Sequence, residues 1–263
     1  MEFVDSHCHL DVAEFDPDRD EVLARCLAQG VNRLIVPGID AAGWPGLLTL
    51  CRRYPALFPA LGLHPLYISR HTDADVETLH RLVRQQRPVA IGECGLDFHV
   101  DGLDRQRQQS LFEQQLQLAQ DVQLPVIIHA RKAHDPILHT LKHFRLTGGT
   151  IHAFNGSLQQ AERYLEHGFR LGFGGTLTYP RSRRIRHLAA SLPLSAIVLE
   201  TDAPDMTVSQ HRGERNSPEY LPLCAAALAR VRDMDIVEIA RITTANALDV
   251  FALDKPWHAN TTA

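Results

Sequence analysis

Residues 3–9 read Phe-Val-Asp-Ser-His-Cys-His, an apolar pair followed by a run of mostly polar side chains. Successive side chains of a β-strand point to opposite faces, so Asp5, His7 and His9 are expected on one face. Two imidazoles held by one rigid strand end can chelate a single metal ion. This stretch therefore predicts a strand that ends in a candidate metal site.

Seven more apolar runs follow along the chain, each followed by a segment with a helical pattern. Together with Phe3-Val4, the runs cover residues 33–36, 60–63, 89–92, 125–128, 149–151, 169–173 and 196–199. The helical patterns cover residues 16–30, a segment ending near residue 54, and residues 73–86, 104–122, 135–144, 157–168, 182–191, 217–232 and 236–251.

These strand and helix units predict the fold class. Runs that are apolar on both faces are typical of a parallel sheet covered by helices. Eight such units within 263 residues predict an α/β fold, a (β/α)8 TIM barrel, with a doubly wound parallel sheet as the alternative. No linker interrupts the pattern, so we expect one domain over residues 1–253 and a C-terminal tail over residues 254–263.

The composition is that of a soluble globular protein, with 44% hydrophobic and 22% charged residues. The net charge of -4 argues against a protein that coats nucleic acid, but a nuclease needs positive charge only at its cleft. Five cysteines without a Cys-x-x-Cys pair favour reduced thiols. With no signal-like start and no window of transmembrane length, we expect a cytoplasmic protein without a membrane partner, and favour a monomer.

Ligand-type side chains recur at the ends of the apolar runs. The candidate metal ligands are His7, His9, Glu93, His129, His152 and Asp202. Each one alone is more simply explained as a hydrogen-bonded core or surface residue. Their recurrence at one topological position favours a shared site, because the carboxyl ends of barrel strands meet at one face, where active sites are built.

The number of these ligands indicates two ions. Four imidazoles and two carboxylates exceed what one tetrahedral zinc ion with an open position needs. We expect two divalent cations that share Glu93, and the mixed nitrogen and oxygen ligands suit Zn²⁺, Mn²⁺, Ni²⁺ or Mg²⁺. Glu93 and Asp202 are thus candidate catalytic residues, with Asp202 orienting a water molecule and accepting its proton. Asp5 and Glu200 are candidates for orienting ligand imidazoles, or else form buried ion pairs.

Basic residues cluster behind the last two apolar runs. They are Arg181, Arg183, Arg184 and Arg186 after the seventh run, and Arg212 and Arg215 after the eighth. Barrels often bind phosphate behind these two strands. We expect Arg183 and Arg186 on a solvated helix face and Arg215 in contact with substrate. The sequence contains no nucleophile elbow, Walker loop or convincing dinucleotide fingerprint.

These motifs resemble those of the TatD-type metal-dependent hydrolases, within the amidohydrolase-like barrel superfamily. The matching stretches are residues 5–9 (Asp-Ser-His-Cys-His), 62–65 (Gly-Leu-His-Pro), 92–97 (Gly-Glu-Cys-Gly-Leu-Asp), 125–129 (Pro-Val-Ile-Ile-His), 152–156 (His-Ala-Phe-Asn-Gly), 200–204 (Glu-Thr-Asp-Ala-Pro) and Asn246. They run in order along nearly the whole chain, so the resemblance is specific, and it points to the YjjV-like branch of the family.

The resemblance implies a two-metal site on the six candidate ligands and hydrolysis of phosphodiester bonds in DNA or RNA. It also implies that His64 contacts substrate. The chain departs from many relatives at Ala153 and Asn155, where they carry Cys and Thr, and at Phe98, where they carry Tyr. None of these is a candidate metal ligand, so we expect the chemistry to be kept, and Asn155 is a further candidate for a substrate contact.

We thus expect a divalent-metal-dependent deoxyribonuclease that acts on single-stranded ends, in the manner of an exonuclease. A phosphodiester carries its own negative charge, which makes two cations a stronger requirement than they are for an amide. An ester or amide hydrolase acting on a small molecule or on acylated RNA is the first alternative. A non-catalytic metal- or nucleic-acid-binding protein is the second, and the presence of Asp202 counts against it.

Overall fold

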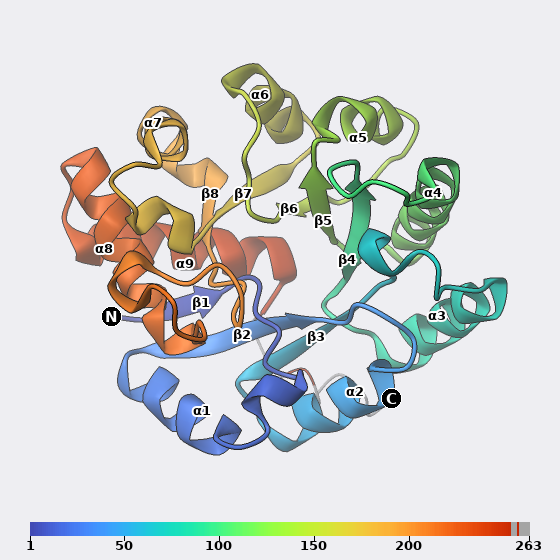
Figure 1. Ribbon diagram of the computed structural model, residues 1–263, viewed down its shortest axis with the longest axis horizontal. Helices are drawn as coiled ribbons and strands as arrows, with labels where there is room; N and C mark the ends of the chain where they lie inside the picture. Colours follow the sequence, from blue (N-terminus) through green and yellow to red (C-terminus); the bar gives the residue numbers. More distant parts are fainter. Residues whose placement is uncertain (254–256, 258–263) are drawn as a thin grey trace.

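The computed structural model describes residues 1–253 and residue 257, which form a ring of parallel strands surrounded by helices (Figure 1). The strands are β1 (Phe3–Asp5), β2 (Val31–Pro37), β3 (Leu57–Leu61), β4 (Ala90–Asp97), β5 (Val126–Arg131), β6 (Gly149–Ile151), β7 (Phe169–Phe173) and β8 (Ile197–Leu199). They pair in chain order, each parallel to the next. The predicted (β/α)8 barrel is confirmed, and the doubly wound sheet is excluded because its strand order does not follow the chain.

Two main-chain hydrogen bonds just beyond β1 and β8 join the first strand to the last. The N–H of Asp202 donates to the carbonyl of His7 at 2.9 Å, and the N–H of His9 donates to the carbonyl of Ala203 at 2.8 Å. Closure of the ring therefore fastens together the two chain segments that carry His7, His9 and Asp202.

Nine α-helices are found in the described part of the chain. They are α1 (Arg19–Ala28), α2 (Trp44–Arg53), α3 (Asp73–Gln86), α4 (Arg105–Val122), α5 (His134–Leu141), α6 (Leu158–Glu166), α7 (Arg183–Ser191), α8 (Leu221–Arg232) and α9 (Ile236–Phe251). They surround the barrel, and both α8 and α9 follow β8 (Figure 1). A capping box formed by Ser157 and Gln160 begins α6.

Apolar side chains fill the space inside the barrel and between the strands and helices. Every residue of β3 and β4 is buried, as expected for parallel strands that are covered on both faces. Trp44, Phe58, Phe112 and Tyr164 are among the largest fully buried side chains. Burial of such apolar surface contributes about 25 cal/mol per Å², which makes it the main source of the stability of this fold.

The predicted tail over residues 254–263 lies outside the described residues, apart from Trp257. Its buried indole donates a hydrogen bond to the carbonyl of Arg87 at 2.9 Å.

The five cysteines are free and buried. In the part of the chain that is described, no helix combines the length and the apolar character that a membrane crossing requires.

Asn246 on α9 is hydrogen-bonded to the main chain at the start of β8. Its side-chain amide donates to the carbonyls of Leu194 at 2.9 Å and Ile197 at 2.7 Å. We expect Asn246→Leu to lower the free energy of unfolding by about 1–3 kcal/mol, because two carbonyls lose their partner. Chemical denaturation measures this, with Ala245→Ser at an exposed site on the same helix as control. Equal unfolding midpoints for both variants would contradict this account of Asn246.

Candidate metal centre

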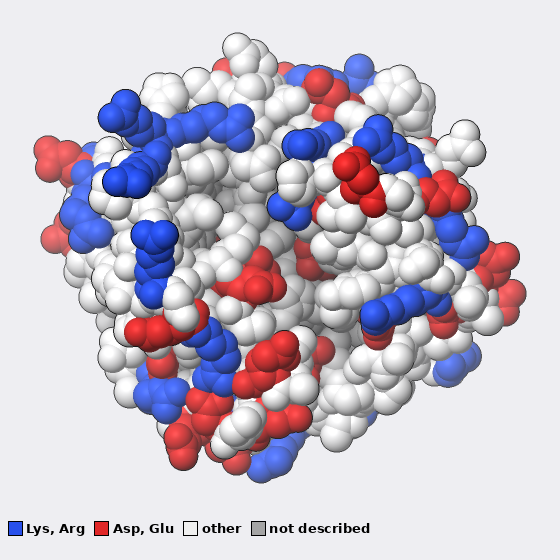
Figure 2. Space-filling view, viewed as in Figure 1, with Lys and Arg blue, Asp and Glu red and all other residues white. Residues whose placement is uncertain are grey.

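The carboxyl ends of the strands open into a cavity of about 790 Å³. Five of the predicted metal ligands line it, namely His9, Glu93, His129, His152 and Asp202. The sixth, His7, is fully buried and contacts Glu93. Figure 2 shows the hollow near the centre of this face, with acidic side chains inside it. The structure therefore brings all six predicted ligands together.

Four of the donor atoms converge beyond the end of β1. The Nε2 atoms of His7 and His9 lie 3.1 Å apart. Glu93 Oε2 lies 3.2 Å from the first of these nitrogens and 3.5 Å from the second, and Asp202 Oδ1 lies 3.7 Å from both. Ligand atoms about 2.1 Å from one ion in a tetrahedral arrangement lie about 3.4 Å from one another. The spacing of this group therefore fits one divalent cation.

The other carboxylate oxygen of Glu93 faces a second pair of imidazoles. Glu93 Oε1 lies 3.1 Å from His129 Nδ1 and 3.3 Å from His64 Nε2. These three side chains form a second group with the spacing of metal ligands. Glu93 is only 2% exposed, so its charge is almost entirely surrounded by nitrogen donors. Each of its two oxygens thus faces a separate group of donors.

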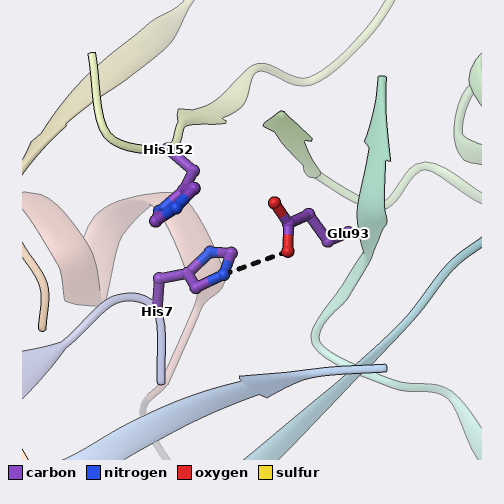
Figure 3. Close-up of side chains that lie close together, drawn as sticks. All are labelled: His7, Glu93 and His152. Carbon is purple, nitrogen blue, oxygen red and sulfur yellow. Dashed lines mark ion pairs between the residues drawn. The ribbon is translucent and has the colours of Figure 1, made fainter. Parts of the chain in front are cut away.

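His152 lies against the first group. Its imidazole stacks on that of His7 with ring centroids 3.7 Å apart, while Glu93 points toward both from β4 (Figure 3). His152 Nε2 lies 3.4 Å from Asp202 Oδ2. The other ring nitrogen, Nδ1, lies 3.1 Å from Glu200 Oε1. Glu200 therefore contacts the imidazole of a candidate ligand, which fits both the orienting role and the buried ion pair expected from the sequence.

Asp5 contacts main chain and the hydroxyl of Thr201 instead of an imidazole. Its Oδ1 accepts the N–H of His7 at 3.2 Å and the N–H of Thr201 at 3.0 Å. Burial raises the pKa of Asp5 to about 8. Asp5 therefore strengthens the connection between the ends of β1 and β8, and it acts on His7 through the backbone.

The position of Glu93 on β4 depends on a glycine two residues later. Gly95 has a φ of +140°, and a Cβ added to it would lie 2.1 Å from the carbonyl oxygen of His129. A residue with a side chain would both strain this backbone and push β4 away from β5. The glycine thus permits the close approach that sets Glu93 beside His129.

Asp97 is absent from the residues predicted as site candidates, yet its side chain contacts His129, one of the candidate ligands. Its Oδ2 lies 3.0 Å from His129 Nε2. An N–H donated to this carboxylate leaves Nδ1 of the ring as the acceptor that faces Glu93. The side chain of Gln108 on α4 bonds both the N–H and the carbonyl of Asp97, at 2.9 and 3.2 Å. Asp97 could have been identified from the sequence by the strand period of two, which puts residues 93, 95 and 97 on one face.

Opposite charges in the cavity stabilise one another. Burial opposes ionisation of Asp202, but the imidazoles of His152, His7 and His9 together outweigh it and lower the pKa of the carboxyl to about 2. Burial also disfavours the charged form of His9, yet the nearby carboxylates, Glu93 foremost, raise the pKa of the imidazole to about 9. Burial prevails at His64, whose pKa falls to about 4. The cavity therefore offers an ionised Asp202 carboxylate and a neutral His64 at neutral pH.

The predicted substrate contacts divide into two groups. His64 and Asn155 line the cavity beside the ligands. Arg215 is not among the described residues that line it. The two oxygens of the Asp18 carboxylate accept hydrogen bonds from its guanidinium at 2.8 and 2.6 Å, and the guanidinium also lies over the ring of Phe15. The structure thus brings His64 and Asn155, but not Arg215, together with the ligands.

Comparison with known sequences gives consistent results over almost the whole chain. Residues 4–252 match the family described as TatD related DNase. The uncharacterized metal-dependent hydrolase YjjV of Escherichia coli (strain K12) is 40% identical over 252 residues, which cover 95% of this chain and 97% of that protein. The 3'-5' ssDNA/RNA exonuclease TatD of Salmonella typhimurium is 35% identical over 251 residues, with coverage of 92% and 96%.

Solved structures agree with the sequence comparison. The crystal structure of YjjV from Escherichia coli matches with a TM-score of 0.92 over 95% of this chain and 98% of that chain. The phosphotriesterase homology protein from Escherichia coli, solved with phosphate in its active site, matches with a TM-score of 0.68 at 13% identity, which shows a common fold alone. The predicted resemblance, including its YjjV-like branch, is confirmed. This chain belongs to the TatD related DNase family of metal-dependent hydrolases.

Proposed function

We propose that this protein uses two divalent cations to hydrolyse phosphodiester bonds at the single-stranded ends of DNA. The observation that carries the proposal is the position of Glu93 between two groups of nitrogen donors. Its Oε2 lies near His7 and His9, and its Oε1 lies near His129. A buried carboxylate with both oxygens directed at imidazoles supports a ligand shared by two ions, as in two-metal hydrolases.

We assign the six predicted ligands to these ions. The first ion takes His7, His9, Glu93 and Asp202, whose donor atoms have the spacing of a tetrahedral site. A second ion would take the other Glu93 oxygen with His129. His152, whose nitrogen has the spacing of a metal ligand with His7 and Glu93, would complete the set. Imidazole and carboxylate ligands suit Zn²⁺, Mn²⁺ or Ni²⁺, and carboxylate oxygens also suit Mg²⁺.

Bound divalent cations would polarise the phosphoryl group, offset its negative charge and lower the pKa of a water molecule. We propose that Asp202 orients this water and accepts its proton. Its side chain is 16% exposed, which supports access from the cavity. We further propose that His64 donates a hydrogen bond to a substrate oxygen. His64 Nδ1 accepts the N–H of Leu66 at 3.1 Å, so the proton of the neutral ring lies on Nε2, the atom directed toward Glu93.

Nucleic acid is the proposed substrate because the Salmonella relative is named an ssDNA/RNA exonuclease. The family match over residues 4–252 supports a single catalytic domain over residues 1–253. Five free, buried cysteines are consistent with a reducing compartment, and we therefore propose the cytoplasm.

One observation favours a second candidate, an ester or amide hydrolase that acts on a small molecule or acylated RNA. Glu14 and Asp205 line the cavity in addition to the ligand carboxylates, and Arg131 is the one basic Lys or Arg side chain among the described residues that line it. Such a cavity does not attract a polyanion along its whole wall, so a small neutral substrate remains the alternative.

Substrate assays of the pure, metal-loaded enzyme separate these two candidates. We expect hydrolysis of single-stranded DNA from its ends, slow cleavage of closed circular DNA, and little turnover of a panel of esters and amides. Loss of activity after chelation and recovery with added metal serve as the control. Turnover of an ester or amide, with DNA and RNA left intact, would refute the nuclease proposal and leave the metal centre standing.

Removing both imidazoles of the first group should remove metal. We expect the double variant His7→Ala with His9→Ala to lose at least one divalent ion per chain, because it loses two of the four donors to that ion. Metal analysis by mass spectrometry measures the stoichiometry, and circular dichroism checks that the variant is folded. A folded double variant with the metal content of the wild type would rule out this assignment.

Asp202 should affect catalysis more than folding. Asp202→Asn keeps the size of the side chain but removes the proton acceptor, so we expect kcat to fall by at least about 10²-fold, within the usual contribution of general-base catalysis. The melting temperature should stay close to that of the wild type. Asp121→Asn, at an exposed site on α4, is the matched control. An Asp202→Asn enzyme with near-wild-type kcat would transfer the base function to another group.

A further inference from the structure

The rim of the cavity carries opposite charges on opposite sides. Because the eight strands follow chain order around the ring, β5 lies four strands from β1 in either direction. Arg131, the last residue of β5, is exposed and lines the cavity. Glu14 and Asp205, from the loops after β1 and β8, line the cavity from the facing side and are also exposed.

The positive charge continues along the loops after β5, β6 and β7. Lys132 is exposed directly after Arg131. Arg184, in the first turn of α7, donates a hydrogen bond to the carbonyl of Asn155, which lines the cavity from the loop after β6. Arg181 is exposed in the loop between β7 and α7. We call Arg131, Lys132, Arg181 and Arg184 the basic arc, and Figure 2 shows basic side chains around the upper side of the hollow.

The cations of the basic arc are available to a ligand. Among the ion pairs of the described residues, none involves Arg131, Lys132 or Arg184. The nearby Arg163 on α6, by contrast, lies 3.8 Å from a carboxylate oxygen of Asp135. Unpaired guanidinium groups beside a cavity suit phosphate, which they bind through two parallel hydrogen bonds.

The facing acidic side chains lie outside the candidate metal-ligand groups. Glu14 and Asp205 belong to none of the candidate ligand groups among the described residues. Cations held by Glu93 and Asp202 would therefore leave the charges of Glu14 and Asp205 uncompensated. Charges separated by less than about 8 Å are incompletely screened at physiological ionic strength, so these carboxylates repel a phosphate that approaches them. We call this pair the acidic wall.

We infer that a single-stranded nucleic acid lies along the basic arc, with phosphates on Arg131 and Arg184, and that its end stops at the acidic wall. The inference rests on the proposed function for the bond that is cleaved. It adds the direction from which the strand enters and a reason for action at an end. A chain that had to continue past the metal centre would bring further phosphates against Glu14 and Asp205.

Binding tests the basic arc without any need for hydrolysis. The probe is a fluorescent oligothymidylate with phosphorothioate linkages, followed by anisotropy with the metal-loaded enzyme over a range of salt concentrations. We expect Arg131→Ala with Arg184→Ala to bind more weakly and to reduce the slope of log K against log salt by about 1.4, from two lost phosphate contacts at about 0.7 each.

The matched control removes the same charge elsewhere, with Arg84→Ala on α3 and Arg230→Ala on α8, both exposed. It should bind like the wild type. Equal weakening in both double variants, or a wild-type affinity that does not depend on salt, would overturn the basic arc.

Cleavage of circular DNA tests the acidic wall. We expect the double variant Glu14→Gln with Asp205→Asn to cleave closed single-stranded circles. The ratio of its circle-cleavage rate to its rate of bis(p-nitrophenyl) phosphate hydrolysis should be higher than the same ratio for the wild type. An unchanged ratio would overturn the wall. If neither protein hydrolyses bis(p-nitrophenyl) phosphate or DNA, the proposed function is wrong, and so is the proposal of end-directed cleavage. The anisotropy measurements still decide whether the basic arc binds the strand.

Discussion

The buried negative charge of Glu93 is the constraint on which the rest of the site depends. A carboxylate that is 2% exposed is costly unless cations or hydrogen-bond donors surround it. Three imidazoles, those of His7, His64 and His129, lie within 3.3 Å of its oxygens. Each imidazole has to direct a specific ring nitrogen at the carboxylate, so the neighbouring residues must fix the position of the strand and the orientation of the ring. Gly95 lets β4 approach β5, and Asp97 holds the ring of His129.

Ring closure adds a second constraint on the same centre. The bonds between the segments after β1 and β8 set the backbone of His7 and His9 against that of Asp202. Asp5 reinforces this connection through the N–H groups of His7 and Thr201. The donors of the first group therefore come from segments nearly 200 residues apart in the sequence, yet their relative positions are set by short backbone contacts.

The strand pattern of the barrel was predictable because parallel strands buried on both faces leave a continuous apolar signal. Boundaries were less predictable where polar residues or proline lie inside a strand. The apolar pattern predicts a strand that starts at residue 60, directly after Pro59, but β3 covers Leu57–Leu61 and includes this proline. Likewise β4 continues through Glu93 to Asp97. The six candidate ligands could be named because they recur at strand ends. The pairing of Arg215 with Asp18 could not, since it joins residues 197 positions apart that only the fold brings together.

The central claim is that Glu93 is shared by two ions, and anomalous X-ray diffraction tests it most directly. Crystals of the metal-loaded protein, measured at the absorption edge of the bound metal, would locate each ion relative to the carboxylate. We predict two anomalous peaks, one within about 2.0–2.2 Å of each Glu93 oxygen, with His7 and His9 at one peak and His129 at the other. A single peak, or two peaks that do not both contact Glu93, would contradict it.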